Sequence, residues 1–317
     1  MAARIGSAAL IVSLAVSACG GESTTTIKTE TEEANAGGDP RSGGGDPELA
    51  KPLLSASGTR ELERFAEDAP GRVGIAVSPL GEGEPVLAGD ALEGRAWSTM
   101  KVPLLVALID RLGGSQELTA PEREDAEAAL TRSDNDAALA LFDRLQNLEG
   151  GLVPASRAIE SALRQAGDDE TTVNTEPSPE GYSTFGQTIW SAEASTLFFR
   201  ALAGGCLLGE EDTDYVLSLM EDVVPDQRWG LGEAEHPGGA SLAFKGGWGP
   251  EPPGGYLIRQ GGVVDEGDAG YVLSVIAIPA DRGVTSFEAG QELVTEAAAV
   301  VAENVNVTKR AALTCAA

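Results

Sequence analysis

The sequence predicts an α/β sandwich, in which a mostly antiparallel, five-stranded sheet is flanked by helices and carries an inserted all-helical part. Three observations predict it. Strand patterns occur near both ends of the folded region, helical patterns fill its middle, and most strand patterns follow one another at hairpin spacing. Strands joined by short turns pair in antiparallel fashion. Because one sheet then collects strands from both ends of the chain, the helical middle has to be an insertion.

The first half of the folded region begins with a helical pattern at residues 58–68, where apolar residues recur on one face. Strand patterns follow at 72–78 and 84–88, and the Gly-rich stretch between them predicts a hairpin. The next helix is predicted at 97–112. Its apolar residues have helical spacing, and its proline lies close enough to the start to be tolerated.

The second half starts with a region, 118–202, that is expected to be mainly helical with a loop at about 167–186. A further helix is predicted at 212–222. Three strand patterns come next, and an Ala- and Val-rich helix at 287–304 closes the domain. The three strand patterns cover residues 240–245, 255–264 and 270–278.

The N-terminal residues have the composition of an export signal followed by a tether. Arg4 precedes an apolar run that is shorter than the roughly 20 apolar residues of a membrane-spanning helix. The segment after this run is rich in Gly, Ser, Thr, Glu and Pro, which favours a flexible tether because it cannot bury a core. The expected boundaries are 1–18 for a lipoprotein signal peptide, 19–51 for the tether and 52–317 for one folded domain, with its helical insert at about 114–205.

The apolar run ends in Val16-Ser17-Ala18-Cys19, which resembles the lipobox of bacterial lipoproteins. This resemblance implies that Cys19 is lipidated and anchors the protein at the outer face of the cytoplasmic membrane. The alternative is a plain secretory signal and a secreted protein. Because both alternatives place the chain in an oxidising compartment, Cys206 and Cys315 can form a disulfide, although two unpaired cysteines fit the sequence equally well.

The chain carries a formal net charge of −28, which disfavours nucleic acid and anionic lipid headgroups as partners. Membrane association is therefore expected only through the lipid anchor. The sequence contains no C-x-x-C motif or Cys–His cluster. We expect no metal, no organic cofactor and a monomer.

Ser98 and Lys101 are the first pair that could perform chemistry. The one histidine, His236, lies in a Gly- and Pro-flanked stretch that indicates an exposed loop, so serine chemistry needs another base. Residues three apart near a helix start share a face, which brings Lys101 within reach of the Ser98 hydroxyl. Burial would favour the neutral amine that accepts a proton. The alternative is an ordinary helix start, with Ser98 as its N-cap and Lys101 on the surface.

Two further motifs follow along the chain. Ser133-Asp134-Asn135 lies between two helical patterns, and the alternative interpretation is that Ser133 only caps the second helix. Phe244-Lys245-Gly246-Gly247-Trp248 ends a predicted strand. The glycines would let a ligand approach the strand edge, and Lys245 offers a cation to a carboxylate. A hairpin turn with an incidental lysine is the alternative there.

Ser-x-x-Lys, Ser-Asp-Asn and Lys-Gly-Gly, in this order and at these separations, resemble the motifs of class A serine β-lactamases and penicillin-binding proteins. The resemblance covers about residues 58–304 and implies a β-lactamase/transpeptidase-like fold. The implied activity is hydrolysis of a β-lactam amide through an acyl-Ser98 intermediate. Two alternatives are a peptidoglycan D,D-peptidase-like acyl enzyme, which acts on stem peptides and turns over β-lactams slowly, and a catalytically degenerate, lipid-anchored binding protein.

The resemblance also implies a role for each matching position. Ser98 attacks the carbonyl group, Lys101 accepts its proton, and Ser133 passes a proton to the leaving nitrogen. The implied substrate-binding groups are Asn135 for the side-chain amide, Lys245 for the carboxylate, Gly247 at the strand edge, and the backbone N–H groups of Ser98 and Trp248 as the oxyanion hole.

The sequence departs from the family pattern in two places. The family usually has Thr or Ser after the third-motif lysine, and Gly246 removes that hydroxyl, which is worth on the order of 1.5–3 kcal/mol when it binds a charged group. The family's deacylating Glu precedes a helix start that Gln187–Ala192 resembles here. Glu176 lies at nearly the right distance before it and is the candidate base, with Glu170 and Glu180 as rivals. A solvated loop carboxylate is the alternative for Glu176.

Overall fold

The computed structural model describes residues 52–236, 239–251, 255–267, 269–280, 285–307 and 313–315. The expected signal peptide, the tether and Cys19 lie outside these residues, so their boundaries and the lipidation stay predictions. None of the helices within the described ranges is long and apolar enough to cross a membrane.

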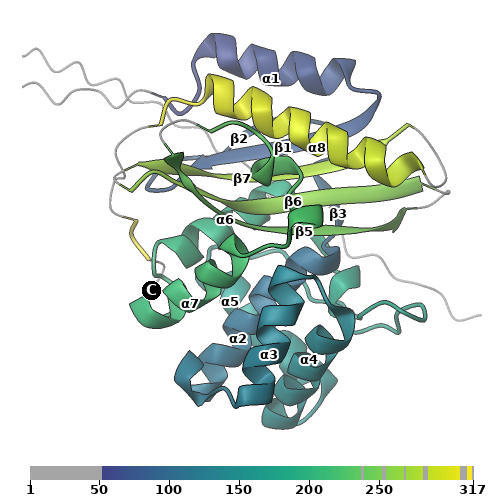
Figure 1. Ribbon diagram of the computed structural model, residues 1–317, viewed down its shortest axis with the longest axis vertical. Helices are drawn as coiled ribbons and strands as arrows, with labels where there is room; N and C mark the ends of the chain where they lie inside the picture. The colour runs from purple at the N-terminus through teal and green to yellow at the C-terminus, as the bar shows by residue number, and fades with distance from the viewer. Residues whose placement is uncertain are drawn as a thin grey trace, which may run out of the picture. The chain divides into compact units, whose positions relative to one another are not determined.

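A five-stranded antiparallel sheet forms the centre of the fold (Figure 1). Its strand order is β2-β1-β7-β6-β5, so strands from the start of the domain lie beside strands from its end, as predicted. The interior strands β1 and β7 are buried along most of their length because both faces of the sheet are covered. The strands are β1 (Gly71–Pro79), β2 (Val86–Gly89), β5 (Ser241–Glu251), β6 (Gly255–Asp265) and β7 (Gly270–Pro279).

Two helices from opposite ends of the domain, α1 (Ala56–Asp68) and α8 (Thr285–Asn304), cover one face of the sheet (Figure 1). The Ser55 hydroxyl caps α1 by accepting a hydrogen bond from the Gly58 N–H at 3.1 Å. Leu62 of α1 and Val294 of α8 are fully buried in the core that these helices share with the sheet.

A helical layer covers the other face of the sheet (Figure 1). Helix α6 (Ala192–Ala203) lies directly against the sheet, where Phe199 fills the space above Gly261 of β6. Helix α2 (Lys101–Leu112) is buried from Lys101 to Ile109, which is why its sequence is apolar on all sides. The other helices of this layer are α3 (Ala120–Thr131), α4 (Asn135–Glu149), α5 (Leu152–Gln165) and α7 (Glu210–Glu221).

The predicted elements are present, and one boundary differs in a way that concerns the candidate site. The prediction ended the third-motif strand at Lys245, whereas β5 continues to Glu251. The glycines after Lys245 remain extended because they pair with β6, for example Gly247 with Arg259. The third motif therefore lies within an edge strand and not in a hairpin turn.

Cys206 and Cys315 form a disulfide, with their Cα atoms 5.2 Å apart. The bond ties residues 313–315 to the segment that follows α6. The sequence had left this pairing open, because nothing local relates two cysteines that are separated by 109 residues.

His236 is half-buried, so the prediction of an exposed loop was wrong. Its Nε2 donates to the Leu231 carbonyl at 2.7 Å, and its Nδ1 accepts from the Tyr271 hydroxyl at 2.9 Å. These roles follow because a carbonyl oxygen can only accept a hydrogen bond. The imidazole is thus engaged in the packing of the sheet.

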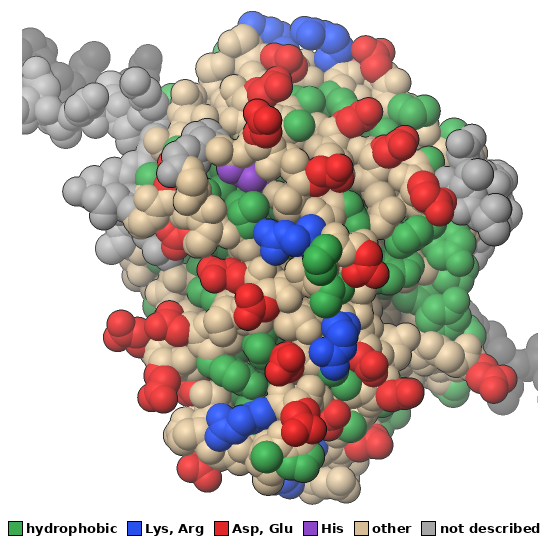
Figure 2. Space-filling view, viewed as in Figure 1, with side chains coloured by type: hydrophobic (Ala, Val, Ile, Leu, Met, Phe, Trp, Pro, Cys, Tyr) green, Lys and Arg blue, Asp and Glu red, His purple; other side chains and the backbone are tan. Residues whose placement is uncertain are grey.

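Acidic side chains are spread over the face of the molecule shown in Figure 2, with a few basic side chains between them. This distribution agrees with the formal net charge of −28. Since the acidic groups are scattered and do not gather at one place on this face, they indicate a highly charged surface and not a specific binding patch.

Candidate active site

Ser98 lies in a single 3₁₀ turn, η1 (Trp97–Met100), which leads directly into α2. Trp97 has a φ of +47°, a left-handed conformation that costs a non-glycine residue on the order of 1–3 kcal/mol. The Ala96 N–H donates to the Thr188 carbonyl at 2.7 Å and holds the chain before this turn. The alternative of Ser98 as a helix N-cap is wrong, because Met100 occupies the cap position of α2.

A short two-stranded sheet places this turn. Strand β3 (Glu93–Arg95) ends just before Trp97 and pairs with β4 (Ile189–Ser191), which opens α6. The β3–β4 sheet therefore holds the segment that carries Ser98 on one side, and the buried start of α2 holds it on the other.

Ser133 also has a left-handed backbone, with a φ of +59°, in the connection between α3 and α4. The cap of α4 is Asp134, whose carboxylate accepts from the Ala137 N–H at 2.9 Å. The alternative in which Ser133 only caps the next helix is therefore wrong. Its hydroxyl is left to the site, where it accepts a hydrogen bond from the Lys245 ammonium at 2.9 Å.

Lys101 is 2% exposed, so it is not the surface residue of the alternative interpretation. Its ammonium donates to the Ser133 carbonyl at 2.6 Å, the Asp134 carbonyl at 3.1 Å and the Asn135 Oδ1 at 2.8 Å. It also lies 3.5 Å from the Ser133 hydroxyl. Burial lowers the pKa of Lys101 to about 7, and the charge of Asp134 opposes this shift only in part. The neutral amine, the form that accepts a proton, is thus accessible near neutral pH.

Lys245 is fully buried, and its ammonium donates to the Ser133 hydroxyl and to the Gly246 carbonyl at 3.0 Å. Burial, together with the nearby charge of Lys101, holds the pKa of Lys245 well below its ordinary value. The Ser133 hydroxyl therefore lies between two lysines that come from different layers of the fold. This arrangement suits a group that passes protons.

Gly247 brings the edge of β5 against the backbone of Ser98. A Cβ atom on Gly247 would lie 2.9 Å from the Ala96 carbonyl oxygen and 3.0 Å from the Ser98 amide nitrogen. A larger residue would therefore push the strand away from Ser98. Trp248, the next residue of β5, lines the same cavity as Ser98.

Ser98 is half-buried and lines a cavity of about 150 Å³. The side chains of the second motif and of the loop before α6 line the same cavity. None of the described residues that line it has a charged side chain. The lining residues are Trp97, Ser98, Ser133, Asn135, Tyr182, Ser183, Gly186, Trp248, Gly249 and Tyr256.

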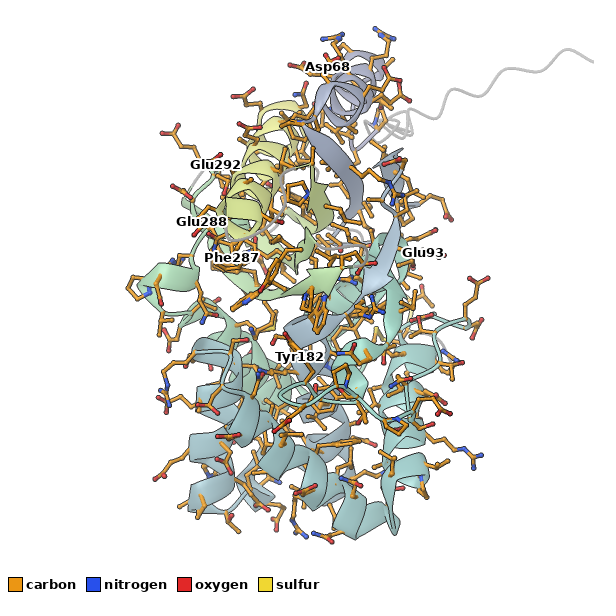
Figure 3. The ribbon with its side chains drawn as sticks, turned by 90° about the vertical axis from the view of Figure 1, so that its right-hand side faces the viewer. Asp68, Glu93, Tyr182, Phe287, Glu288 and Glu292 are labelled. Atoms are coloured by element: carbon orange, nitrogen blue, oxygen red, sulfur yellow. A yellow bond between two sulfur atoms is a disulfide. The ribbon has the colours of Figure 1, made fainter. Side chains whose placement is uncertain are left out.

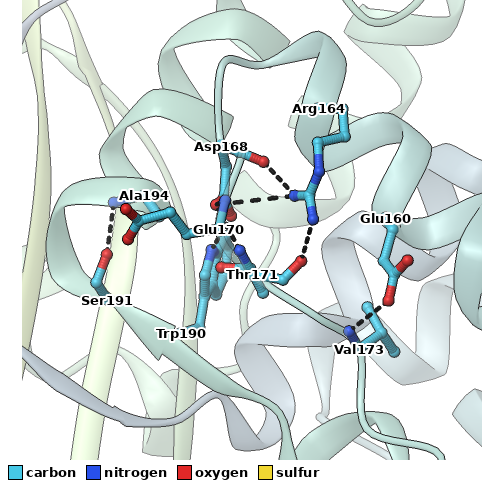
Figure 4. A network of polar contacts seen from close by, with 9 residues as sticks. All are labelled: Glu160, Arg164, Asp168, Glu170, Thr171, Val173, Trp190, Ser191 and Ala194. Carbon is cyan, nitrogen blue, oxygen red and sulfur yellow. Dashed lines mark hydrogen bonds and ion pairs between the residues drawn. The ribbon is translucent and has the colours of Figure 1, made fainter. Parts of the chain in front are cut away.

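The loop that carries Tyr182 starts from a network of polar contacts, shown in Figure 4. The buried Asp168 carboxylate accepts from the Thr171 N–H at 3.0 Å and from the Trp190 Nε1 at 3.2 Å. Arg164 donates to the carbonyls of Asp168 and Thr171, and the Val173 N–H donates to Glu160 at 2.8 Å. The first part of the loop is therefore held against α5 and β4.

Glu176 is exposed and lies apart from the Ser98 cavity. It lines a second cavity of about 800 Å³, together with its rival Glu170. Glu180 is exposed and lines neither of these two cavities. The structure thus brings Ser98, Lys101, Ser133, Asn135, Lys245, Gly247 and Trp248 together and does not bring the three candidate carboxylates to them.

Three aromatic residues of the cavity, Trp97, Tyr182 and Tyr256, were not predicted from the sequence. Trp97 could have been noticed as the neighbour of Ser98. No local pattern relates Tyr182 or Tyr256 to the motifs, because only the folded loop and the β5–β6 hairpin bring them there. Within the described ranges, no group of three His, Cys, Asp or Glu side chains could hold a metal ion.

No protein-family model matches the sequence, and no curated protein sequence matches it. Solved structures do match in fold. A structure of PBP-A is 21% identical, with a TM-score of 0.60 over 80% of this chain and 97% of that chain. A class A β-lactamase from Mycobacterium abscessus is 21% identical, with a TM-score of 0.59 over 77% and 97% of the two chains. The chain has the class A β-lactamase fold.

Other structures with the β-lactamase fold give the same result. A β-lactamase from Streptosporangium roseum is 17% identical, with a TM-score of 0.59 over 78% of this chain and 98% of that chain. The fold class implied by the three motifs is therefore confirmed. At identities this low, the similarity shows the fold alone. The chemistry has to be argued from the residues of the site.

Proposed function

We propose that this protein is a serine hydrolase that reacts with β-lactams through an acyl-Ser98 intermediate. The observation that carries the proposal is that Ser98 and Ser133 line one small cavity, while Lys101 and Lys245 both lie at the Ser133 hydroxyl. A solved structure of a PBP-A variant, 20% identical with a TM-score of 0.60, is an acyl-enzyme complex with penicillin G. This likeness supports the same chemistry here.

The positions of Ser98, Lys101, Ser133 and Lys245 support the following steps of acylation. Neutral Lys101 takes the proton of Ser98, either directly as the site adjusts to substrate or through Ser133, and the Ser98 oxygen attacks the carbonyl carbon. The backbone N–H groups of Ser98 and Trp248 stabilise the negative charge on the carbonyl oxygen. Ser133 gives its proton to the leaving nitrogen and recovers one from the lysines beside it.

Deacylation distinguishes the two enzymatic alternatives, and one observation favours slow release. No carboxylate is among the described residues that line the Ser98 cavity, and Glu176 is exposed and lines the other cavity. A water molecule attacking acyl-Ser98 would then have Lys101 as its base. This arrangement supports a D,D-peptidase-like acyl enzyme with slow β-lactam turnover more than a rapid β-lactamase, which would need Glu176 to move to the site.

The test is incubation of the soluble domain with a chromogenic cephalosporin while colour and intact mass are followed. We expect a mass adduct on Ser98 that persists over many minutes, with slow colour development. Rapid turnover without an accumulated adduct would support the β-lactamase alternative. Neither adduct nor colour would favour the non-catalytic binding protein, and a Ser98→Ala variant that reacts like the parent would overturn the assignment of the nucleophile.

For the location of the protein, we propose export with a lipid anchor on Cys19 and a tether up to residue 51. The sequence pattern around Cys19 supports this proposal, and the disulfide between Cys206 and Cys315 fits an oxidising compartment. The test is cell fractionation of the parent and of Cys19→Ser. The parent should sediment with membranes, and the variant should not. Equal distribution of the two would leave a plain secretory signal as the explanation.

A further inference from the structure

Arg259 of β6 is a fully buried cation without a carboxylate. No ion pair among the described residues includes it, and its Nε and Nη2 have no hydrogen-bond partner there. Burial lowers the pKa of Arg259 to about 9, which still leaves the guanidinium charged at neutral pH. A buried, unpaired charge destabilises a fold, and an apolar side chain would fill the same space without that cost. Packing alone therefore does not account for an arginine at this position.

Backbone carbonyls of the β3–β4 sheet bind Arg259. Its Nη1 donates to the Trp190 carbonyl at 2.9 Å, the Gly94 carbonyl at 3.2 Å and the Arg95 carbonyl at 3.4 Å. Its guanidinium also lies over the Trp190 ring, 5.4 Å from the centroid. Because Gly94 and Trp190 are paired in the β3–β4 sheet, one side chain of the large sheet holds both strands of the small one.

Strand β3 packs directly on β6 at this point. A Cβ atom on Gly94 would clash with the side chain of Leu257, so only glycine lets the two strands come this close. Figure 3 shows Glu93, the first residue of β3, at the level of the sheet and above Tyr182 of the Ser98 cavity. The small sheet is therefore placed between the large sheet and the loop that lines this cavity.

The segment that β3 leads into carries Ser98. Arg95 ends β3, and Trp97, with its left-handed φ of +47°, follows directly before Ser98. A non-glycine residue keeps such a backbone only where the surrounding structure imposes it. Because Arg259 binds the last two carbonyls of β3, any shift of that strand is passed on to Ser98.

Arg259 is also next to the strand edge that meets Ser98. Its backbone pairs with Gly247 of β5, and paired residues of neighbouring strands direct their side chains to the same face of the sheet. On this face a Cβ atom on Gly247 would lie 3.0 Å from the Ser98 nitrogen. The backbone of Arg259 thus adjoins β5 at the Ser98 contact, while its side chain holds the segment that leads to Ser98.

A second contact holds β3 on its exposed side. The Arg95 Nη1 lies 3.0 Å from the Glu251 Oε2 at the end of β5, and the two side chains are 30% and 26% exposed. An ion pair with this exposure contributes little to stability. It can therefore be removed without opening the core, which makes it a probe of the position of β3.

We propose that Arg259 is a positioning residue for acylation, which holds the Ser98 turn at a fixed distance from β5 by binding the carbonyls of β3 and β4. The proposal rests on the proposed function, because acylation of Ser98 is the step that it affects. The alternative is an arginine that contributes only to packing and stability. The two differ in the reactivity of a folded protein that lacks the guanidinium.

The first test compares the parent with Arg259→Met and Arg259→Lys. The rate constant of acylation at saturating chromogenic cephalosporin is measured from the mass of the Ser98 adduct over time, well below the melting temperature of each variant. Methionine cannot donate to the carbonyls, so we expect Arg259→Met to acylate about 10²-fold more slowly, the effect of a misplacement of about 1 Å. Lysine keeps the charge and the donors, and Arg259→Lys should stay within about tenfold of the parent.

The matched control is Arg200→Met. Arg200 of α6 is half-buried and donates to the Ser78 hydroxyl at 3.2 Å and the Gly83 carbonyl at 2.6 Å, apart from the Ser98 cavity. Its loss should lower the melting temperature and leave the rate constant of acylation unchanged. A folded Arg259→Met that acylates within about threefold of Arg200→Met would overturn the proposal. So would an Arg259→Lys that is no faster than Arg259→Met.

The second test does not depend on whether Arg259→Met folds. Arg95→Gln removes the ion pair with Glu251 and is combined with Arg259→Lys. Because lysine is shorter than arginine and holds β3 less firmly, the Arg95–Glu251 pair becomes more important in that variant. We expect the double variant to acylate at least about threefold more slowly than the product of the two single effects predicts, since coupled sites are not additive.

The control for the second test is Arg72→Gln, which removes the exposed ion pair between Arg72 and Asp90. This pair lies away from β3, so Arg72→Gln and Arg259→Lys should combine multiplicatively. If Arg95→Gln and Arg259→Lys also combine multiplicatively, β3 does not transmit the effect of Arg259 to Ser98 and the proposal is overturned.

Failure of this proposal is distinguishable from failure of the proposed function. The comparisons between variants require a Ser98 adduct in the parent. If the parent forms no adduct with the cephalosporin, the proposed function fails and this proposal fails with it. If the parent reacts and the variants give one of the contrary results, only the role of Arg259 is lost.

Discussion

The Lys245 ammonium donates a hydrogen bond to the Ser133 hydroxyl at 2.9 Å, although the two residues come from the edge of the sheet and from the connection between α3 and α4. Ser133→Ala removes the shared hydroxyl between Lys245 and Lys101. We expect acylation of Ser98 to slow by roughly 10²–10⁴-fold, the usual contribution of a positioned proton donor. The measurement is the rate of adduct formation by mass spectrometry. Ser178→Ala, a serine outside this cavity, is the control and should react like the parent.

Lys101 predicts the pH dependence of acylation. Its pKa is lowered to about 7 by burial, so the amine is protonated below that pH and cannot accept the proton of Ser98. The acylation rate should therefore fall about tenfold per pH unit below about 7 and level off above it. A rate that is constant down to pH 5, where only a carboxylate would still act as base, would contradict this role of Lys101.

Glu176 gives a separate prediction for release of the acyl group. Because its carboxylate is exposed and lines the other cavity, Glu176→Gln is expected to change the lifetime of acyl-Ser98 by less than about twofold. The lifetime is measured by mass after excess β-lactam is removed. Glu170→Gln, on the same cavity, is the control. A much longer lifetime in Glu176→Gln alone would show that this residue is the base and that the loop moves toward Ser98.

The sequence was sufficient for the parts of the site that depend on local spacing. Ser98 and Lys101 lie in one turn and the start of one helix, so their spacing alone relates them. The sequence could not distinguish Asp134 from Ser133 as the cap of α4, because both residues are good caps and only the backbone decides. The left-handed backbone of Ser133 explains why its hydroxyl does not cap α4.

Contacts between distant segments could not be predicted from the sequence. The stretch around His236 has the Gly and Pro content of a loop, but the Leu231 carbonyl and the Tyr271 hydroxyl bind the imidazole, which is half-buried. The same reason explains why the aromatic residues of the Ser98 cavity were not predicted. Tyr182 comes from the loop before α6 and Tyr256 from the start of β6, and neither has a partner at a recognisable spacing.

The disulfide between Cys206 and Cys315 predicts a redox-dependent stability. It closes a long loop, with a sequence separation of 109, and such bonds contribute typically about 2–4 kcal/mol to the free energy of unfolding. We expect the reduced protein to unfold at a lower temperature than the oxidised protein. Cys315→Ser should match the reduced parent and should not respond to reductant. Identical melting temperatures with and without reductant in the parent would argue against the bond.

The close packing of Gly247 against Ser98 predicts the effect of moving the strand edge away from the serine. In Gly247→Ala, the new methyl group would lie 2.9 Å from the Ala96 carbonyl oxygen and 3.0 Å from the Ser98 nitrogen, so β5 has to move outward. A shift of the Trp248 N–H away from the carbonyl oxygen weakens the oxyanion hole, and loss of one such donor lowers the rate by about 10²–10³-fold. Acylation of Ser98 by a chromogenic cephalosporin is the measurement.

The control for this prediction is Gly209→Ala, because a Cβ atom on Gly209 meets no atom within 4 Å and its φ of −64° suits alanine. This variant should acylate at the parent rate. Gly247→Ala should also keep a melting temperature close to that of the parent, since an edge strand can yield without opening the core. If Gly247→Ala acylates as fast as Gly209→Ala, the Trp248 N–H does not stabilise the transition state, and the oxyanion would have to be bound by Ser98 and another donor.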